Sequence, residues 1–247
     1  MGQVSYDFTG QVVLITGGGT GIGRGMAESF ARAGATVVVG GRRIEPLQAL
    51  CSQFPGKADF VQLDVGIEAE RQAAIRQVIE RHGRLDVLIN NALSYTGAPL
   101  DVLSVEEIES MYRVLLQGTV MMTRAALPHL IASRGSVLNT SSVAGRFVEP
   151  ITGAVYGSAK AGVNQFTRIL AAELAAKGVR VNAIAPGATA TEAMVAEQEQ
   201  LYIDMTPMGR LGVPADIAAV ALFLASDGGG WVTGQIIDVS GGLGISG

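Results

Sequence analysis

The chain has 247 residues, of which 48% are hydrophobic and 16% charged, and its formal net charge of -4 at pH 7 argues against the basic face with which proteins bind nucleic acid. Its single cysteine, Cys51, excludes an intrachain disulfide and a thiolate cluster for a metal ion. The N-terminal MGQVSYDFTG lacks the basic run and apolar core of a secretory signal, and no later apolar run is long enough to cross a bilayer. We therefore expect a cytoplasmic protein without membrane partners and, from its net charge, without nucleic-acid partners.

Short apolar runs alternate with longer segments of helical period along the whole chain. This rhythm predicts an α/β fold, a single-domain Rossmann-type doubly wound sheet of seven mostly parallel strands with helices on both faces. No repeat or linker interrupts it, so we expect one domain over 1–247, with a substrate lid at about 187–213 after a strand's carboxyl end. The strands are expected at 11–17, 36–41, 58–65, 85–92, 135–142, 179–187 and 234–242, and the helices are expected to begin near Ile22, Ile44, Ile67, Ser104, Thr152 and Pro214.

The first predicted strand runs directly into the glycine-rich sequence TGGGTGIGRG. Glycine allows a sharp turn and a close approach to a pyrophosphate, and the following helix directs its free N–H groups and positive dipole end at the phosphates. This pattern predicts a dinucleotide site, and the alternative is a glycine-rich turn without a ligand. The expected contacts are Gly17, Thr20, Gly21, Ile22 and Gly23.

The second strand ends in Gly40-Gly41-Arg42-Arg43, where a carboxylate would bind a free ribose 2′-hydroxyl. No carboxylate is present there, and a guanidinium suits a 2′-phosphate, so NADP(H) is favoured over NAD(H). The alternative is that Arg42 and Arg43 form the solvated start of the next helix.

Polar residues follow the third and fourth strands as well. Asp64, with the Val65 backbone beside it, is a candidate acceptor for an adenine amino group, or an ordinary N-cap of the helix near Ile67. Asn91 and its neighbour Asn90 are expected to close the adenosine pocket, to satisfy nearby backbone groups, or both.

Tyr156 and Lys160 stand four residues apart in VYGSAKAGV, which places both on one face of a helix. A nearby ammonium stabilises a phenolate, so the pair suits general acid/base work. An isolated pair of this kind is common by chance. The preceding strand strengthens it, because that strand ends in Ser141 and Ser142, one of which could polarise a carbonyl while the other bonds local backbone.

With TGGGTGIG, LDV, NNA, SS, YGSAK and APG in this order, the chain resembles the classical short-chain dehydrogenase/reductase family over nearly its whole length. The resemblance implies that Tyr156 is the general acid/base, that Lys160 lowers its pKa and binds ribose, and that Ser142 orients the substrate carbonyl. It also implies a homodimer or homotetramer, to which long helices at about 104–132 and 153–177 would contribute. The residues implied to border the nicotinamide are Pro186, Gly187, Thr189 and Thr191.

Two of the chain's departures from this family's pattern change the side chains expected near the active site. Leu115 stands where members usually carry an Asn that supports a proton relay, and Gln117 and Thr119 are weak replacements. Leu93 replaces the glycine of the usual NNAG. We therefore expect an NADPH-dependent ketoreductase for a mostly apolar small molecule, and keep two alternatives: a catalytically impaired nucleotide-binding sensor or partner subunit, and an NAD(P)-linked alcohol dehydrogenase. Tyr95, Phe147, Met194 and Tyr202 are candidates to line the substrate pocket or to pack in the core.

Overall fold

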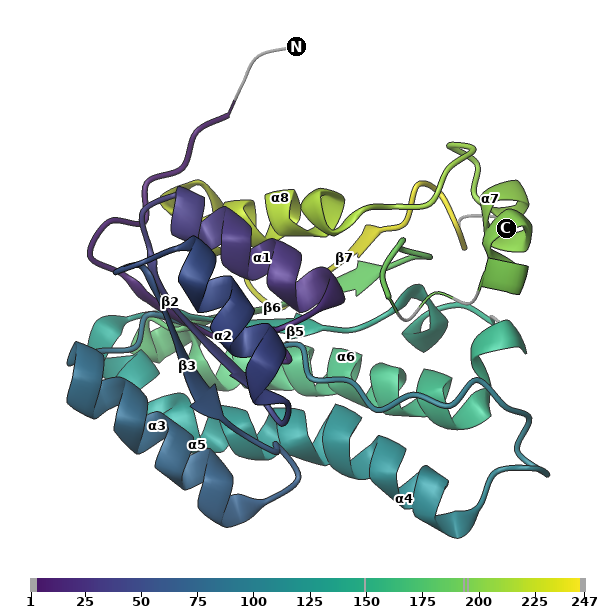
Figure 1. The fold of residues 1–247 in the computed structure, drawn as a ribbon, viewed down its shortest axis with the longest axis horizontal. Helices are drawn as coiled ribbons and strands as arrows, with labels where there is room; N and C mark the ends of the chain where they lie inside the picture. Colours follow the sequence, from purple (N-terminus) through teal and green to yellow (C-terminus); the bar gives the residue numbers. More distant parts are fainter. Residues whose placement is uncertain (1–3, 149, 193, 195, 245–247) are drawn as a thin grey trace.

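The computed structural model describes residues 4–148, 150–192, 194 and 196–244. Seven strands form one sheet in the order β3-β2-β1-β4-β5-β6-β7, and every recorded pairing between neighbours is parallel (Figure 1). The predicted Rossmann-type fold is confirmed. The strands are β1 Val12–Thr16, β2 Thr36–Gly41, β3 Ala58–Gln62, β4 Val87–Asn90, β5 Ser136–Thr140, β6 Arg180–Pro186 and β7 Ile236–Val239.

Helices cover both faces of the sheet (Figure 1). In β1, Val13 and Ile15 belong to a core with α1, α2 and α8, whereas Val12 and Leu14 belong to a second core with α3, α5 and α6. This follows from the two-residue period of a strand buried on both sides. The helices are α1 Gly21–Arg32, α2 Ile44–Gln53, α3 Glu68–His82, α4 Val105–Tyr112, α5 Thr119–Ser133, α6 Ala154–Leu174, α7 Ala196–Met205 and α8 Pro214–Ala225.

The long helix expected at about 104–132 is divided in the structure. Ser104 and Glu107 form a reciprocal capping box at its start, so α4 begins as expected. A π-helical segment, Arg113–Gly118, then separates α4 from α5. Such segments often occur at functional sites, and this one contains Leu115.

The expected lid at 187–213 contains a helix that the sequence pattern did not predict. This helix, α7, follows Ala193 and Val195, which lie outside the described residues. Thr189 and Gly212 form a parallel bridge between the two arms of the segment, and the amide of Ala190 donates to the Gly212 carbonyl at 2.8 Å. Within the described part of the chain, no helix has the length and apolar character needed to span a membrane.

Candidate active site

A cavity of about 610 Å³ lies where strands β1 to β6 reach their carboxyl ends. The residues proposed from the sequence as catalytic or cofactor-binding line this one cavity, with the exception of Asn90, although they come from distant parts of the chain. They are Gly17, Thr20, Gly21, Ile22, Gly23, Arg42, Arg43, Asp64, Val65, Asn91, Ser142, Tyr156, Lys160, Pro186, Gly187, Thr189 and Thr191.

The glycine turn between β1 and α1 is packed too closely for side chains. A Cβ added at Gly23 would lie 2.2 Å from the carbonyl oxygen of Gly17, and Gly21 has a φ of +52°. Both positions therefore require glycine. The first turn of α1 carries no acidic residue of its own, and the Thr20 side chain does not cap it. The turn thus leaves the space and the amide donors that a diphosphate needs.

Glu192 reaches this turn from the lid segment, a contact that the local sequence pattern does not predict. Its Oε2 accepts a hydrogen bond of 3.0 Å from the amide of Gly21, 171 residues away. The Thr191 side chain packs against Gly21 in the same place. A carboxylate of the protein therefore lies at the positive end of α1, where an anion is favoured.

Asn91 ties β4 to the glycine turn. Its Nδ2 donates to the carbonyl oxygens of Thr16 and Gly17 at 3.2 and 3.1 Å, and its amide donates to Thr16 Oγ1 at 2.9 Å. Asn91 thus satisfies neighbouring backbone groups and also lines the cavity, while Asn90 is buried and donates to Thr123 and Asn139.

Asp64 does not act as the N-cap of α3. The N-cap position is Ile67, and Asp64 Oδ1 accepts instead from the amide of Gly66 at 2.8 Å. The N-cap alternative for Asp64 is therefore wrong, because a carboxylate this close in sequence reaches the amide two residues on.

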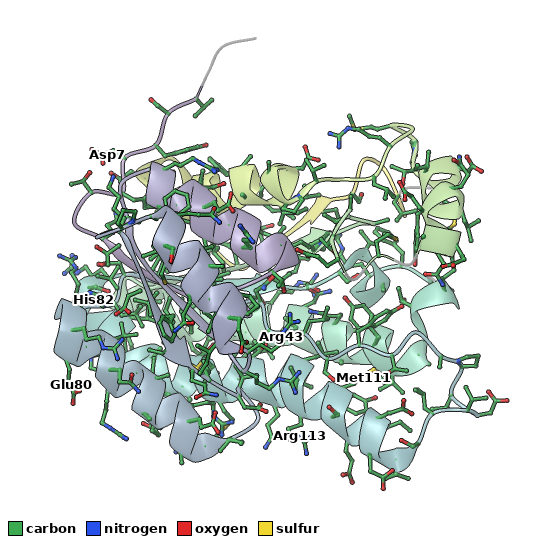
Figure 2. All side chains as sticks on the ribbon, in the orientation of Figure 1. Asp7, Arg43, Glu80, His82, Met111 and Arg113 are labelled. Atoms are coloured by element: carbon green, nitrogen blue, oxygen red, sulfur yellow. The ribbon has the colours of Figure 1, made fainter. Side chains whose placement is uncertain are left out.

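Arg42 and Arg43 stand at the cavity end nearest β2 and α2. Arg43, labelled in Figure 2, takes the N-cap position of α2, and both side chains are exposed. No ion pair joins either guanidinium to another described residue. Two cations thus line the cavity without an ion-pair partner in the part of the chain that the structure describes.

Lys160 is almost entirely buried, with 4% of its surface exposed. Its Nζ donates to the Thr140 carbonyl at 2.6 Å and lies 5.6 Å from the centre of the Tyr156 ring. Burial lowers the pKa of the Lys160 ammonium to about 8, because the charged form loses hydration. The predicted pairing of Tyr156 and Lys160 on one face of α6 is present in the structure.

The two serines after β5 have different surroundings. Ser141 Oγ donates to the Lys160 carbonyl at 3.3 Å, so its hydrogen is used by the backbone of α6. Ser142 Oγ accepts from the amide of Ala144 at 3.2 Å, a bond that leaves the serine hydrogen available to a ligand. This favours Ser142 over Ser141 as the serine that contacts a substrate.

Leu115 lies behind Tyr156 in an apolar cluster. It is 1% exposed and packs with Met111 of α4, which Figure 2 labels, and with Val155 and Ala159 of α6. Tyr156 borders the same cluster. The side chain at this position therefore offers no polar group to the region behind the Tyr156–Lys160 pair.

The remaining wall of the cavity is mostly apolar. The rings of Tyr95 and Tyr156 meet edge to face with centres 5.0 Å apart, and Leu93, which is half exposed, lines the same cavity. Tyr95, Met194 and Tyr202 line the cavity as expected, but Phe147 does not. Among the described residues, no three His, Cys, Asp or Glu side chains gather closely enough to hold a metal ion.

Comparison with known proteins supports this arrangement. The family model described as enoyl-(acyl carrier protein) reductase matches residues 17–244. A 3-oxoacyl-(acyl-carrier-protein) reductase, FabG of Thermotoga maritima, is 38% identical over 241 residues, which cover 95% of this chain and 98% of that protein. Glucose 1-dehydrogenase 2 of Bacillus subtilis is 36% identical over 250 residues, 96% of each. A short-chain type dehydrogenase/reductase from Mycobacterium marinum has a similar structure, with a TM-score of 0.92 and 29% identity over 96% of both chains.

Proposed function

This chain belongs to the classical short-chain dehydrogenase/reductase family and is an NAD(P)-dependent oxidoreductase, and we propose that it is an NADPH-dependent ketoreductase that interconverts a ketone and a secondary alcohol on a mostly apolar small molecule. The observation that carries this proposal is the shared cavity. Ser142, Tyr156 and Lys160 line it together with the glycine turn and the Arg42-Arg43 pair.

The nicotinamide, when bound, supplies a hydride to the carbonyl carbon or accepts one from the alcohol. Tyr156 Oη gives its proton to the substrate oxygen during reduction, and the Ser142 hydroxyl donates a hydrogen bond to the same oxygen. The buried Lys160 ammonium stabilises the phenolate that remains on Tyr156. These roles need all three groups within reach of one substrate oxygen, and the fact that Ser142, Tyr156 and Lys160 line the same cavity supports the assignment.

NADPH is proposed over NADH because of the charge at the β2 end of the cavity. Arg42 and Arg43 present guanidinium groups that can bind a 2′-phosphate, and Asp64, the nearby carboxylate after β3, already accepts from Gly66. The amides of the glycine turn would hold the pyrophosphate. Pro186, Gly187, Thr189 and Thr191 would border the nicotinamide from the β6 side.

The segment 187–213 is proposed as the substrate lid of a single catalytic domain. Its residues Met194, Gln198 and Tyr202 line the same cavity as Leu93 and Tyr95. The apolar side chains among them suit a neutral, largely apolar ketone. Homodimers or homotetramers are the proposed assembly, with the α4–α5 and α6 faces as contact surfaces.

One assay tests this proposal. NADPH and NADH are titrated against the protein, and NADPH absorbance is then followed with a panel of ketones and β-ketoacyl thioesters. We expect tighter binding of NADPH and turnover of an apolar ketone. Tight NADPH binding without turnover of any substrate would favour the sensor or partner-subunit function, which the apolar Leu115 cluster makes the second candidate. Turnover only of alcohols with NAD(P) would assign the chain as an alcohol dehydrogenase.

A further inference from the structure

A third residue continues the face of α6 that carries Tyr156 and Lys160. Asn164 lies four residues after Lys160, so the three side chains follow one another along one face of the helix. Asn164 is buried, with 2% of its surface exposed. Its Nδ2 donates a hydrogen bond of 3.1 Å to the carbonyl oxygen of Gly145.

Gly145 ends the tight turn that begins at Ser142. The amide of Gly145 donates to the Ser142 carbonyl at 3.0 Å, and the amide of Ala144 donates to Ser142 Oγ at 3.2 Å. The first of these bonds, together with that from the Arg146 amide to the Val143 carbonyl at 2.9 Å, forms the 3₁₀ turn Val143–Gly145, and the second caps its start. Any shift of the Gly145 carbonyl therefore moves the backbone that fixes the Ser142 hydroxyl.

The turn is pressed directly onto the backbone of α6. A Cβ added at Gly145 would lie 2.7 Å from the carbonyl carbon of Lys160, and one added at Gly157 would lie 3.0 Å from the Ala144 oxygen. Glycine at both positions permits this contact, but close contact alone does not fix the turn along the helix axis. The Asn164 amide supplies a directed bond that does.

The buried side chain of Asn164 has one polar atom that lowers the stability of the fold. Its Oδ1 is inaccessible to solvent and has no hydrogen-bond partner among the described residues. An unpaired buried amide oxygen destabilises a fold, so the stabilising contribution of Asn164 is confined to its bond with the Gly145 carbonyl. Leucine, which has nearly the same shape, would remove both the unpaired oxygen and this bond.

We propose that Asn164 is a positioning residue for Ser142, holding the Val143–Gly145 turn against α6 so that the Ser142 hydroxyl meets the substrate oxygen beside Tyr156. This inference rests on the proposed function, because it assigns Asn164 a task only if Ser142 contacts the substrate. Asn164 acts through the turn and not on the reacting atoms.

The first test separates positioning from stability. In Asn164→Leu we expect kcat to fall about tenfold, because a small displacement of a hydrogen-bond donor weakens transition-state stabilisation, while KM changes less. NADPH affinity should stay at the wild-type value, and Tm should change little, because the loss of the bond to Gly145 and the removal of the unpaired Oδ1 oppose each other. Gln165→Leu, the same change on the exposed side of α6, is the matched control and should leave kcat unchanged. Equal kcat values in Asn164→Leu and the control would overturn the proposal.

A double-mutant cycle then tests the route through Ser142. Ser142→Ala is expected to lower kcat about 100-fold. If Asn164 acts through Ser142, adding Asn164→Leu to Ser142→Ala lowers kcat no further than about twofold. A full additional tenfold loss would show that Asn164 acts elsewhere. Unchanged kcat in Ser142→Ala alone would instead remove the proposed role of Ser142, an outcome distinct from a failure of Asn164.

Discussion

The hydroxyl of Thr119 donates a hydrogen bond of 2.8 Å to the carbonyl oxygen of Leu115. Leu115 lies within the π-helical segment and Thr119 is the first residue of α5, where the wider hydrogen-bonding pattern changes back to that of an α-helix. The Thr119 hydroxyl thus satisfies a backbone oxygen of that segment, which differs from the task of a relay residue. The Leu115 side chain meanwhile packs into apolar surroundings.

Leu115→Asn is expected to lower the free energy of unfolding by about 2 to 4 kcal/mol, because it places an amide among Met111, Val155 and Ala159 and removes apolar contacts. Urea denaturation measures this change, and Gln117→Asn, an exposed change two residues away, is the control. If the missing Asn limits proton supply, the variant also turns over faster than the wild type. Unchanged stability would contradict the packing described for Leu115.

Tyr156→Phe is expected to reduce turnover roughly 100- to 10,000-fold, because it removes the proton donor while keeping the ring. NADPH binding, measured by fluorescence titration, should be retained. Tyr112→Phe is the matched control, since Tyr112 bonds Ser158 at 2.7 Å on the exposed side of the helices and does not line the cavity. An unchanged turnover rate in Tyr156→Phe would contradict the role of Tyr156 as the proton donor.

Arg42→Ala is expected to weaken NADPH binding roughly 10- to 100-fold, because it removes one or two charge-assisted hydrogen bonds to the phosphate. NADH lacks this phosphate, so its binding should change by less than about twofold. Dissociation constants for both cofactors give the ratio. Arg76→Ala removes an exposed arginine that does not line the cavity and serves as the control. Equal weakening of both cofactors would refute the phosphate assignment.

Lys160→Met is expected to raise the free energy of unfolding at pH 7 by about 2 to 3 kcal/mol, because burial lowers the Lys160 pKa from 10.5 to about 8 and the folded state keeps an unfavourable buried charge. Turnover should be lost in the same variant.

The sign of the pH dependence provides a second check on Lys160. Between about pH 8 and 10.5 the unfolded chain holds the Lys160 proton and the folded chain does not, so this group makes the wild type more stable as pH rises. The stability difference between Lys160→Met and the wild type should therefore shrink over that range. A constant difference would mean that Lys160 titrates normally in the folded protein.

Glu192→Gln is expected to tighten NADPH binding about two- to fivefold, because it removes a negative charge that lies on the Gly21 amide at the start of α1. The glutamine side chain can still accept the hydrogen bond, so the turn itself is preserved. Glu197→Gln makes the same charge change on the exposed surface of α7 and should have no effect on NADPH binding. Weaker binding in Glu192→Gln would indicate that the carboxylate supports the cofactor site.

The chain by itself determined the parallel sheet and much of the site. A strand that helices cover on both faces, as β1 is, has a continuous run of apolar residues, and parallel strands require helical crossovers between them. The alternation of apolar runs with helical segments therefore predicted the fold. Because parallel strands end at one edge, motifs after separate strands had to meet there, and Arg42, Asn91, Ser142 and Tyr156 do line one cavity. The spacing of Tyr156, Lys160 and Asn164 was also visible in the sequence, but nothing local marked Asn164 as useful.

Only the tertiary structure decided the contacts that join distant segments. The bond between Glu192 and Gly21, the separation of Ser141 from Ser142, and the anchoring of Gly145 by Asn164 depend on which backbones approach closely in three dimensions. Helix propensity likewise does not distinguish the π-helical segment at Leu115, whose side chain packs with residues of α4 and α6, from an uninterrupted α-helix. The local sequence pattern determines the helices and strands and the sheet edge at which the site residues meet. Hydrogen bonds between residues far apart in the sequence determine what each side chain at that edge can do.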